Sequence, residues 1–155
     1  YNNLNQVRPE RRVTLGKCAR IAPNVSFSNG ERIHIGGRAQ VGVRCSIWAG
    51  NNTGRIFIGN DSTLGPDCML TASNYGTAPG KLVTDQPTDE EDIVIGSGVW
   101  LGAKTLVTAG VEIGDDCIVG GGSVVTRSLP PGAIAAGAPA RVVKFRDGSP
   151  APPKP

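Results

Sequence analysis

The sequence predicts an all-β solenoid in which short strands alternate with corners. Between residues 92 and 126, large aliphatic side chains recur at every sixth position. Small or β-branched residues follow most of these aliphatics four positions later, and glycine comes directly after several of them. The six aliphatic positions are Ile95, Leu101, Val107, Ile113, Val119 and Val125.

The six-residue period excludes both a helix and a single long strand. In a helix, six steps of about 100° move an apolar position round the cylinder by about 240°, so no apolar stripe forms. In a long strand, a turn-prone Gly, Asn or Asp in each hexad would interrupt the ladder after a few residues. A chain that turns a corner once per hexad keeps the same residue of every hexad inside.

Two stretches carry a resemblance to a known family. Residues 92–126 read DIVIGSGVWLGAKTLVTAGVEIGDDCIVGGGSVVT, and residues 124–146 read VVTRSLPPGAIAAGAPARVVKFR. Together they resemble the hexapeptide-repeat acyltransferases, and the resemblance extends over residues 13–146. It implies a left-handed parallel β-helix with three flat sides and coils of about 18 residues. It also implies that a last strand is followed by a Gly-x-Pro-Ala-Arg turn.

The first half of the chain shows weaker hexads with two corner insertions. Residues 1–12 are polar and aperiodic, and we expect an extended lead-in. Short insertions are expected at residues 28–32 and 51–55, the second in a GNNTGR segment whose residues tolerate left-handed backbone. The large apolar residues expected to point inward in this half are Leu15, Ile21, Phe27, Ile35, Val41, Ile47, Ile58, Leu64 and Leu70.

The period is absent between residues 71 and 92, where glycines, prolines and acids join two coils. Excursions of this length in a compact fold are usually functional or disordered, so we expect a functional loop. The proline-rich residues 147–155, DGSPAPPKP, are predicted to form a flexible tail. The sequence therefore predicts one β-helix domain over residues 13–146 that carries one long loop.

Composition limits the class of protein. The chain has 155 residues, of which only 5% are aromatic and 22 are glycine, as suits a narrow prism filled by aliphatics. A net charge of +3 is too small to indicate a nucleic-acid partner. Neither an apolar run of about 18 residues nor a signal peptide occurs, which favours a soluble, cytoplasmic protein without a membrane span.

The cysteines are expected to be free thiols. Cys45, Cys68 and Cys117 each lie four residues after an inward aliphatic, in the small inward position of the repeat. A reduced thiol acts there as a small hydrophobe, which favours a reducing compartment. The spacing matches no zinc motif, and one histidine cannot supply the three-histidine zinc site of the γ-class carbonic anhydrases. We therefore expect no metal.

The family resemblance implies transfer of an acetyl group from acetyl-CoA to a hydroxyl or amine without a covalent enzyme intermediate. The attacking acceptor must lose a proton, so a base is needed within hydrogen-bond reach. In the sugar O-acetyltransferases this base is a histidine on the long loop. Here the matching segment, residues 71–76, contains none: Tyr75 or Asn74 occupies its place, depending on the alignment. Tyrosine, with an ordinary pKa of about 10, and asparagine are poor bases at neutral pH.

Three alternatives follow for the missing histidine. The loop could be altered, which would leave a slow enzyme that still binds its substrates. A second group could serve as the base, the candidates being Asp85, Tyr75 and His34. The protein could also be a non-catalytic scaffold or CoA-binding subunit. His34 lies between two inward isoleucines and is expected to point outward, stacked beside Phe57 and Val94.

The resemblance also supplies residues for the CoA side of a site. It matches Trp100 to the family's tryptophan, Ala103 to a residue that contacts the pantetheine arm, and Gly121 to a small residue beside the cofactor. The basic residues suit the phosphates of CoA, because Arg and Lys neutralise phosphate charge. The phosphate-side candidates are Thr126, Arg127, Arg141 and Lys144. The resemblance further implies a homotrimer with the cofactor between neighbouring subunits, and a sugar or polysaccharide-precursor hydroxyl as acceptor.

Overall fold

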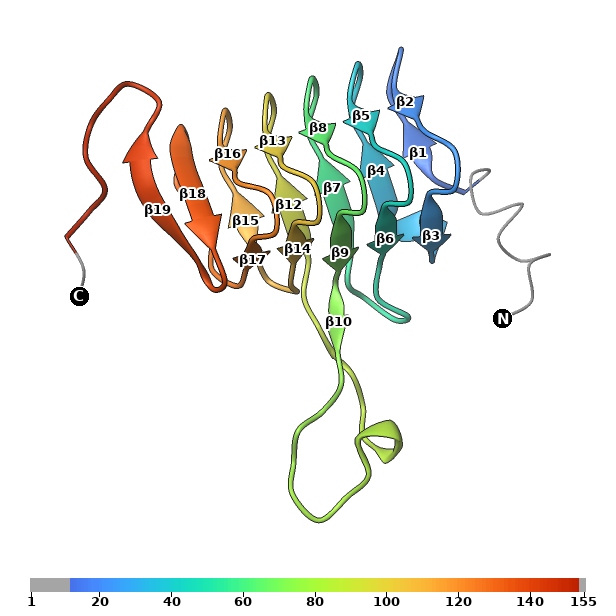
Figure 1. Cartoon of the computed structure of the whole chain (residues 1–155). Helices are drawn as coiled ribbons and strands as arrows, with labels where there is room; N and C mark the ends of the chain where they lie inside the picture. The colour runs from blue at the N-terminus through green and yellow to red at the C-terminus, as the bar shows by residue number, and fades with distance from the viewer. Residues whose placement is uncertain (1–11, 154–155) are drawn as a thin grey trace.

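The computed structural model describes residues 12–153, which form a three-sided prism of stacked coils (Figure 1). Each coil contributes one short strand to each of three parallel sheets, named here A, B and C. Sheet A contains, in spatial order, β1 (Thr14–Leu15), β4 (Ile33–Ile35), β7 (Ile56–Ile58), β12 (Ile93–Ile95) and β15 (Glu112–Ile113).

The other two sheets are built in the same way. Sheet B contains β2 (Arg20–Ile21), β5 (Gln40–Val41), β8 (Thr63–Leu64), β13 (Trp100–Leu101), β16 (Ile118–Val119), β18 (Ala133–Gly137) and β19 (Ala140–Phe145). Sheet C contains β3 (Ser26–Ser28), β6 (Ser46–Trp48), β9 (Met69–Thr71), β14 (Leu106–Val107) and β17 (Val124–Val125). The 3-10 turns η2 (Gly30–Arg32) and η3 (Val83–Asp85) lie outside the sheets.

The inward aliphatics stack in register from coil to coil. Ile35, Ile58, Ile95 and Ile113 pair successively along sheet A, and each is at most 3% exposed. Because every rung repeats this placement, each coil buries its apolar residues against its neighbours and the core is a continuous column. The six-residue period thus predicted the core correctly except in the first coil, where Leu15 is 46% exposed and Ile21 is only partly buried.

Small residues fill the inward positions next to the corners. Cys45, Cys68 and Cys117 are buried free thiols, as predicted. Thr105 and Ser123 are also buried, and their hydroxyls donate to the carbonyl oxygens of Gly102 (2.7 Å) and Gly120 (2.5 Å). These bonds satisfy hydroxyl groups that would otherwise be costly to bury.

The corners are made by residues with left-handed backbone, and these are not only Gly, Asn and Asp. Arg38, Arg44 and Lys104 also have positive φ, at 56°, 58° and 61°. Both arginines pair with corner aspartates of the next coil: Arg38 with Asp61 at 2.6 Å, and Arg44 with Asp67 at 2.8 Å. Stacked corners therefore bring opposite charges together across coils.

A C-terminal hairpin ends the prism. β18 continues sheet B, and β19 returns antiparallel to it through a turn of sequence Gly-Ala-Pro-Ala-Arg at residues 137–141. Lys144 forms a bridge with Pro150, so part of the predicted tail runs alongside this hairpin. Within residues 12–153, no helix has the length and apolar character needed to cross a bilayer.

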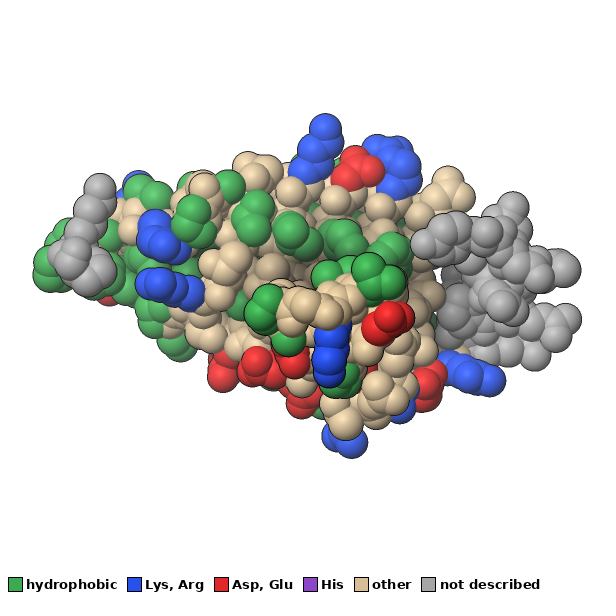
Figure 2. Space-filling model, turned by 90° about the horizontal axis from the view of Figure 1, so that it is seen from below, with side chains coloured by type: hydrophobic (Ala, Val, Ile, Leu, Met, Phe, Trp, Pro, Cys, Tyr) green, Lys and Arg blue, Asp and Glu red, His purple; other side chains and the backbone are tan. Residues whose placement is uncertain are grey.

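One long loop leaves the prism at the corner between sheets C and A (Figure 1). It connects β9 to β12 and contains a short antiparallel ladder of β10 (Ser73–Asn74) with β11 (Asp89–Glu90), which the sequence did not predict. Viewed from the side of this loop, acidic, basic and apolar side chains are interspersed over the surface (Figure 2). On that face the charge pattern is mixed, in keeping with the small net charge.

Candidate active site

Three of the predicted CoA-side residues lie close together in the fold. Trp100 lies on the outer face of sheet B with 54% of its surface exposed. Its strand leads into the corner between sheets B and C, where Ala103 is exposed. Gly121 lies at the same corner one coil further on: a Cβ added there would approach the Ala103 carbonyl oxygen at 3.1 Å. Both residues are exposed, so at these two positions successive corners present no side chain larger than a methyl group to solvent.

Two of the predicted basic residues meet at the C-terminal end of the prism. Arg127 and Arg141 both line a pocket of about 640 Å³. The remaining lining residues are Ser128, Leu129, Ala140, Val142, Ala151, Pro152 and Pro153. Thr126 directly precedes Arg127 after β17, whereas Lys144 lies on β19 and is not among the lining residues. We call this cavity the arginine pocket; it combines two guanidinium groups with an apolar wall.

The loop candidates lie away from sheet B. Asn74 ends β10 and pairs with Asp89, and Tyr75 follows it with 60% of its surface exposed. Asp85 is exposed at the end of η3, in the distal part of the loop. Among the described residues, these three side chains share no hydrogen bond, so a single chain does not assemble them into a catalytic pair.

His34 points outward from sheet A, as predicted. Its ring stacks on Phe57 with ring centres 5.0 Å apart and an interplanar angle of 18°. It borders a shallow groove of about 630 Å³, which Thr14 and Val94 also line. Its Nδ1 is buried without a hydrogen-bond partner in the described part of the chain. The structure places His34 and Trp100 on different faces of the prism.

Glu90 is a residue of this region that the sequence did not identify. Its carboxylate accepts hydrogen bonds from the backbone N–H groups of residues 51–54, the corner insertion of the second coil. The N–H groups of Thr53 and Gly54, followed by that of Asn52, hold the pKa of this carboxyl well below its ordinary value. The Gly/Asn-rich turn was one available signal, because successive backbone N–H groups in such turns form anion-binding hollows.

Gln86 organises the outer part of the loop. Its side-chain oxygen accepts a hydrogen bond from the Ala78 N–H at 2.8 Å, and its amide donates to the Ala78 carbonyl at 3.2 Å. The same amide group reaches the carbonyls of Lys81 and Leu82. One side chain thus spans the interior of the loop, which gives the Asp-Gln-Pro segment a structural role.

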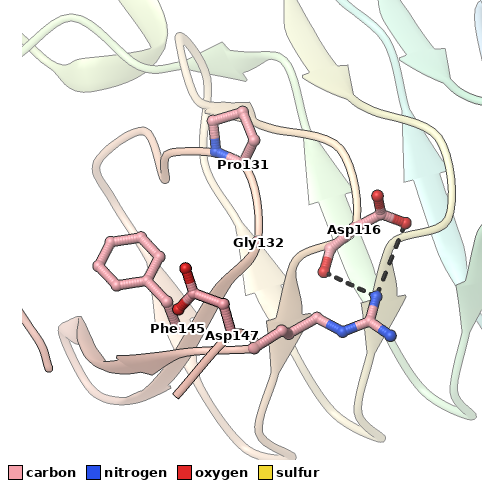
Figure 3. Close-up of a pocket in the computed structure, with 6 residues that line it drawn as sticks. Asp116, Pro131, Gly132, Phe145 and Asp147 are labelled. Atoms are coloured by element: carbon pink, nitrogen blue, oxygen red, sulfur yellow. Dashed lines mark hydrogen bonds and ion pairs between the residues drawn. The ribbon is translucent and has the colours of Figure 1, made fainter. Parts of the chain in front are cut away.

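A further pocket of about 520 Å³ lies beside the C-terminal hairpin (Figure 3). The guanidinium of Arg146, which lines this pocket, pairs with the Asp116 carboxylate at 3.6 Å and donates to the Asp116 carbonyl at 3.3 Å. A second acid, Asp147, lies at its edge beside Phe145. Because Arg146 is paired with a carboxylate, this pocket is a poorer anion site than the arginine pocket, where Arg141 donates to a neutral group, the Ala140 carbonyl oxygen, at 2.9 Å.

The stacked coils, the open corners and the long loop together define a hexapeptide-repeat protein. The family model described as bacterial transferase hexapeptide (six repeats) matches residues 92–127. A protein of Escherichia coli strain K12 named putative colanic acid biosynthesis acetyltransferase WcaF is 30% identical over 132 residues, which cover 85% of this chain and 69% of that protein. The chain belongs to the bacterial hexapeptide-repeat transferase family.

Other relatives agree with this membership. The galactoside O-acetyltransferase of Escherichia coli K12 is 32% identical over 131 residues, 84% of this chain and 63% of that protein. This chain therefore spans less than two thirds of that relative's length. A maltose O-acetyltransferase from Clostridium difficile 630 superposes with a TM-score of 0.79 at 26% identity, over 93% of this chain and 75% of the other.

A solved structure of a galactoside acetyltransferase in complex with coenzyme A is 27% identical, with a TM-score of 0.69. The superposition covers 85% of this chain and 64% of that one. The predicted fold, an all-β left-handed parallel β-helix, is confirmed by these similarities together with the three parallel sheets. The assignment of individual site residues stays a prediction.

Proposed function

We propose that this protein is an acetyl-CoA-dependent O-acetyltransferase that acts on a hydroxyl of a sugar or polysaccharide precursor. The observation that carries the proposal is the arginine pocket at the C-terminal end of the prism, where Arg127 and Arg141 line one cavity together with apolar residues. The named relatives, which include sugar O-acetyltransferases and one complex with coenzyme A, support it.

The donor side fits the chemistry of acetyl-CoA. The small residues at the corner admit a thin pantetheine arm, with Trp100 as an apolar wall beside it. Arg127 and Arg141 neutralise phosphate groups, for which a forked guanidinium is well suited. The apolar wall of the arginine pocket suits the adenine ring. Thr126 and Lys144 supply further polar contacts at the edge of this end.

The acceptor side lies where the loop leaves the prism. Trp48 on β6 is aligned with Thr71, the last residue of β9 before the loop. The indole N–H of Trp48 donates to the Ser26 hydroxyl at 3.2 Å, and Trp48 is 37% exposed. The fixed ring offers a flat apolar face on which a sugar ring can stack. We expect Trp48→Ala to raise the KM for the acceptor while the Kd for CoA stays unchanged.

The reaction is a direct transfer. The acceptor hydroxyl oxygen attacks the thioester carbonyl carbon, the carbon–sulfur bond breaks, and CoA leaves as a thiol after it gains a proton. The hydroxyl proton passes to a base on the protein. The carbonyl oxygen becomes negatively charged in the transition state, and exposed backbone N–H groups at an open corner can stabilise it.

The base is the least conventional part of the site. By the family resemblance, either Tyr75 or Asn74 takes the place of the family's histidine, depending on the alignment, with Asp85 in the same loop. His34 is available from sheet A if a neighbouring subunit brings its loop to that face. A homotrimer of parallel prisms would create such a contact, and we propose this assembly in a reducing, cytoplasmic setting. No metal takes part in this proposal.

Calorimetry and turnover test the function. We expect CoA to bind, and we expect slow acetylation of one member of a panel of hexoses and oligosaccharides. Tyr75→His or Asn74→His should raise turnover by about 100-fold or more if the loop lacks its base, since a positioned general base contributes about 10²–10⁴. Failure to bind CoA would remove the assignment. Binding without turnover in all three proteins would favour a non-catalytic trimeric scaffold or CoA-binding subunit.

A further inference from the structure

The most highly coordinated carboxylate in the described chain lies outside the residues assigned to the reaction. Glu90 accepts hydrogen bonds from the backbone N–H groups of Asn51 at 2.9 Å, Asn52 at 3.1 Å, Thr53 at 2.6 Å and Gly54 at 3.0 Å. Four donors converge on two oxygens, an arrangement typical of anion-binding turns. We call residues 51–54 the socket.

The socket is shaped for this side chain. Gly50 is buried, and a Cβ at that position would collide with the Glu90 carboxylate. Thr88 adds a hydroxyl donor to Oε1 at 3.0 Å. Charge-assisted bonds of this kind are stronger than neutral ones, so the carboxylate is held in one position. The corner insertion in the second coil thus has a partner 36 or more residues later in the chain.

A second carboxylate fastens the same side of the loop. Asp92 accepts a hydrogen bond from the Arg55 N–H at 2.7 Å, and Ile93 donates to the Arg55 carbonyl at 2.9 Å. Glu91 donates its N–H to the Ala72 carbonyl at 3.2 Å. The returning end of the loop is therefore tied to the prism at three consecutive residues, with Glu90 the outermost.

Glu90 connects the socket to the candidate site through one ladder. In the β10–β11 pair, Glu90 aligns with Ser73 and Asp89 aligns with Asn74. Tyr75 is the next residue after this ladder. A change in the position of Glu90 would therefore move β11, and with it the part of β10 that presents Asn74 and Tyr75.

We propose that Glu90 is a positioning residue, whose carboxylate in the socket fixes the orientation of the loop of residues 71–92 and thereby presents Tyr75 and Asn74 to the acceptor. The part that concerns the acceptor rests on the proposed function. The part that concerns loop orientation stands on the hydrogen bonds alone. The two parts need separate measurements.

Limited proteolysis measures the orientation without any activity assay. Lys81 is exposed in the distal loop and provides a cleavage site for a lysine-specific protease. Loss of the carboxylate should open the loop more often, so Glu90→Gln and Glu90→Ala should be cut at Lys81 about tenfold faster than the parent protein. Glu91→Gln, which removes the same charge from the exposed neighbouring side chain, is the matched control and should be cut at the parent rate.

Steady-state kinetics and calorimetry then separate positioning from general destabilisation. We expect Glu90→Gln to lower kcat/KM for the acceptor by about tenfold or more, as misplaced catalytic groups do, with the Kd for CoA unchanged. Equal cleavage at Lys81 in all variants would overturn the loop-orientation part of the proposal, and faster cleavage with unaltered acceptor kinetics would overturn the acceptor part. If the parent protein turns over no sugar, the proposed function fails, whereas the cleavage rates still decide whether Glu90 orients the loop. Glu90→Gln keeps the side-chain shape in case Glu90→Ala does not fold.

Discussion

A carboxylate surrounded by backbone N–H groups keeps its negative charge in acid where an ordinary glutamate becomes neutral. Glu90 is in this situation, and the N–H groups of Thr53 and Gly54 lower its pKa the most. The hydroxyl of Thr88 acts in the same direction, and partial burial opposes it. The charge of Glu90 therefore contributes to stability, and that contribution depends on pH in a definite direction.

The direction of this pH dependence follows from the difference between the pKa of Glu90 in the folded and unfolded states. The folded-state pKa of Glu90 lies below its ordinary value of 4.5, so its stabilisation is fully present above pH 4.5 and is lost as the pH falls through the folded-state pKa. We expect the Tm difference between the parent protein and Glu90→Gln to be constant at neutral and weakly acidic pH. It should narrow progressively as the pH falls below 4.5 toward the folded-state pKa. Thermal melts followed by circular dichroism measure this, and a gap that closes at pH 5 would contradict it.

Sequence reasoning at the residue scale succeeded where a position repeats and failed where it does not. The outward direction of His34 and its stacking beside Phe57 follow from strand alternation and the count of hexads, and both were predicted correctly. Glu90 was missed because its partners are backbone groups of a turn distant in the sequence. Side-chain type alone does not reveal such a contact, since the turn conformation has to be known first.

The coil is the repeating element, and its stability comes from the apolar side chains that stack inside the prism. Leu101 is 0% exposed and packs between coils, whereas Leu15 occupies the equivalent kind of position in the first coil and is 46% exposed. We expect Leu101→Ala to lower the free energy of unfolding by about 2–5 kcal/mol, because buried Leu→Ala changes leave a cavity. Leu15→Ala should cost clearly less. Urea denaturation of both variants tests this, and equal costs would contradict the continuous column.

The corners show how far residue type alone can predict the turns of each coil. Turn-prone residue types located most corners, yet Arg38 and Arg44 also adopt positive φ, where a Cβ is usually unfavourable. Each pairs with an aspartate of the adjacent coil, Asp61 or Asp67, which itself has positive φ. The β10–β11 ladder was likewise not predicted, because its strands have two residues each and carry no periodic signal.

At the scale of the whole molecule, a prism of this shape leaves wide outer faces. Exposed large hydrophobic side chains lie on the loop and on two strands of sheet B: Leu82 is 69% exposed, Val83 51%, Trp100 54% and Val143 57%. Such residues are common at interfaces between subunits. We expect a homotrimer in solution, measurable by light scattering coupled to size-exclusion chromatography. A monomer at micromolar concentration would contradict the assembly and remove His34 as a base supplied across subunits.

The proposed path of CoA from the B–C corner to the C-terminal hairpin requires distant parts of the fold to act on one ligand. Arg127 follows β17, and Arg141 begins the return of β19, so the arginine pocket exists only when the terminal hairpin is in place. Each arginine should contribute to CoA binding chiefly through the phosphates, since a guanidinium can donate two parallel hydrogen bonds to phosphate oxygens.

Arg141→Ala and Arg127→Ala should each weaken CoA binding by about tenfold or more, because charge-assisted hydrogen bonds contribute about 1.5–3 kcal/mol. Binding of a pantetheine fragment without the nucleotide should not change. Arg146→Ala is the control, since Arg146 is already paired with Asp116 in the neighbouring pocket. Calorimetry with CoA and with the fragment measures both effects. If all three variants weaken CoA equally, the basic residues act only through net charge, and the phosphates do not lie in the arginine pocket.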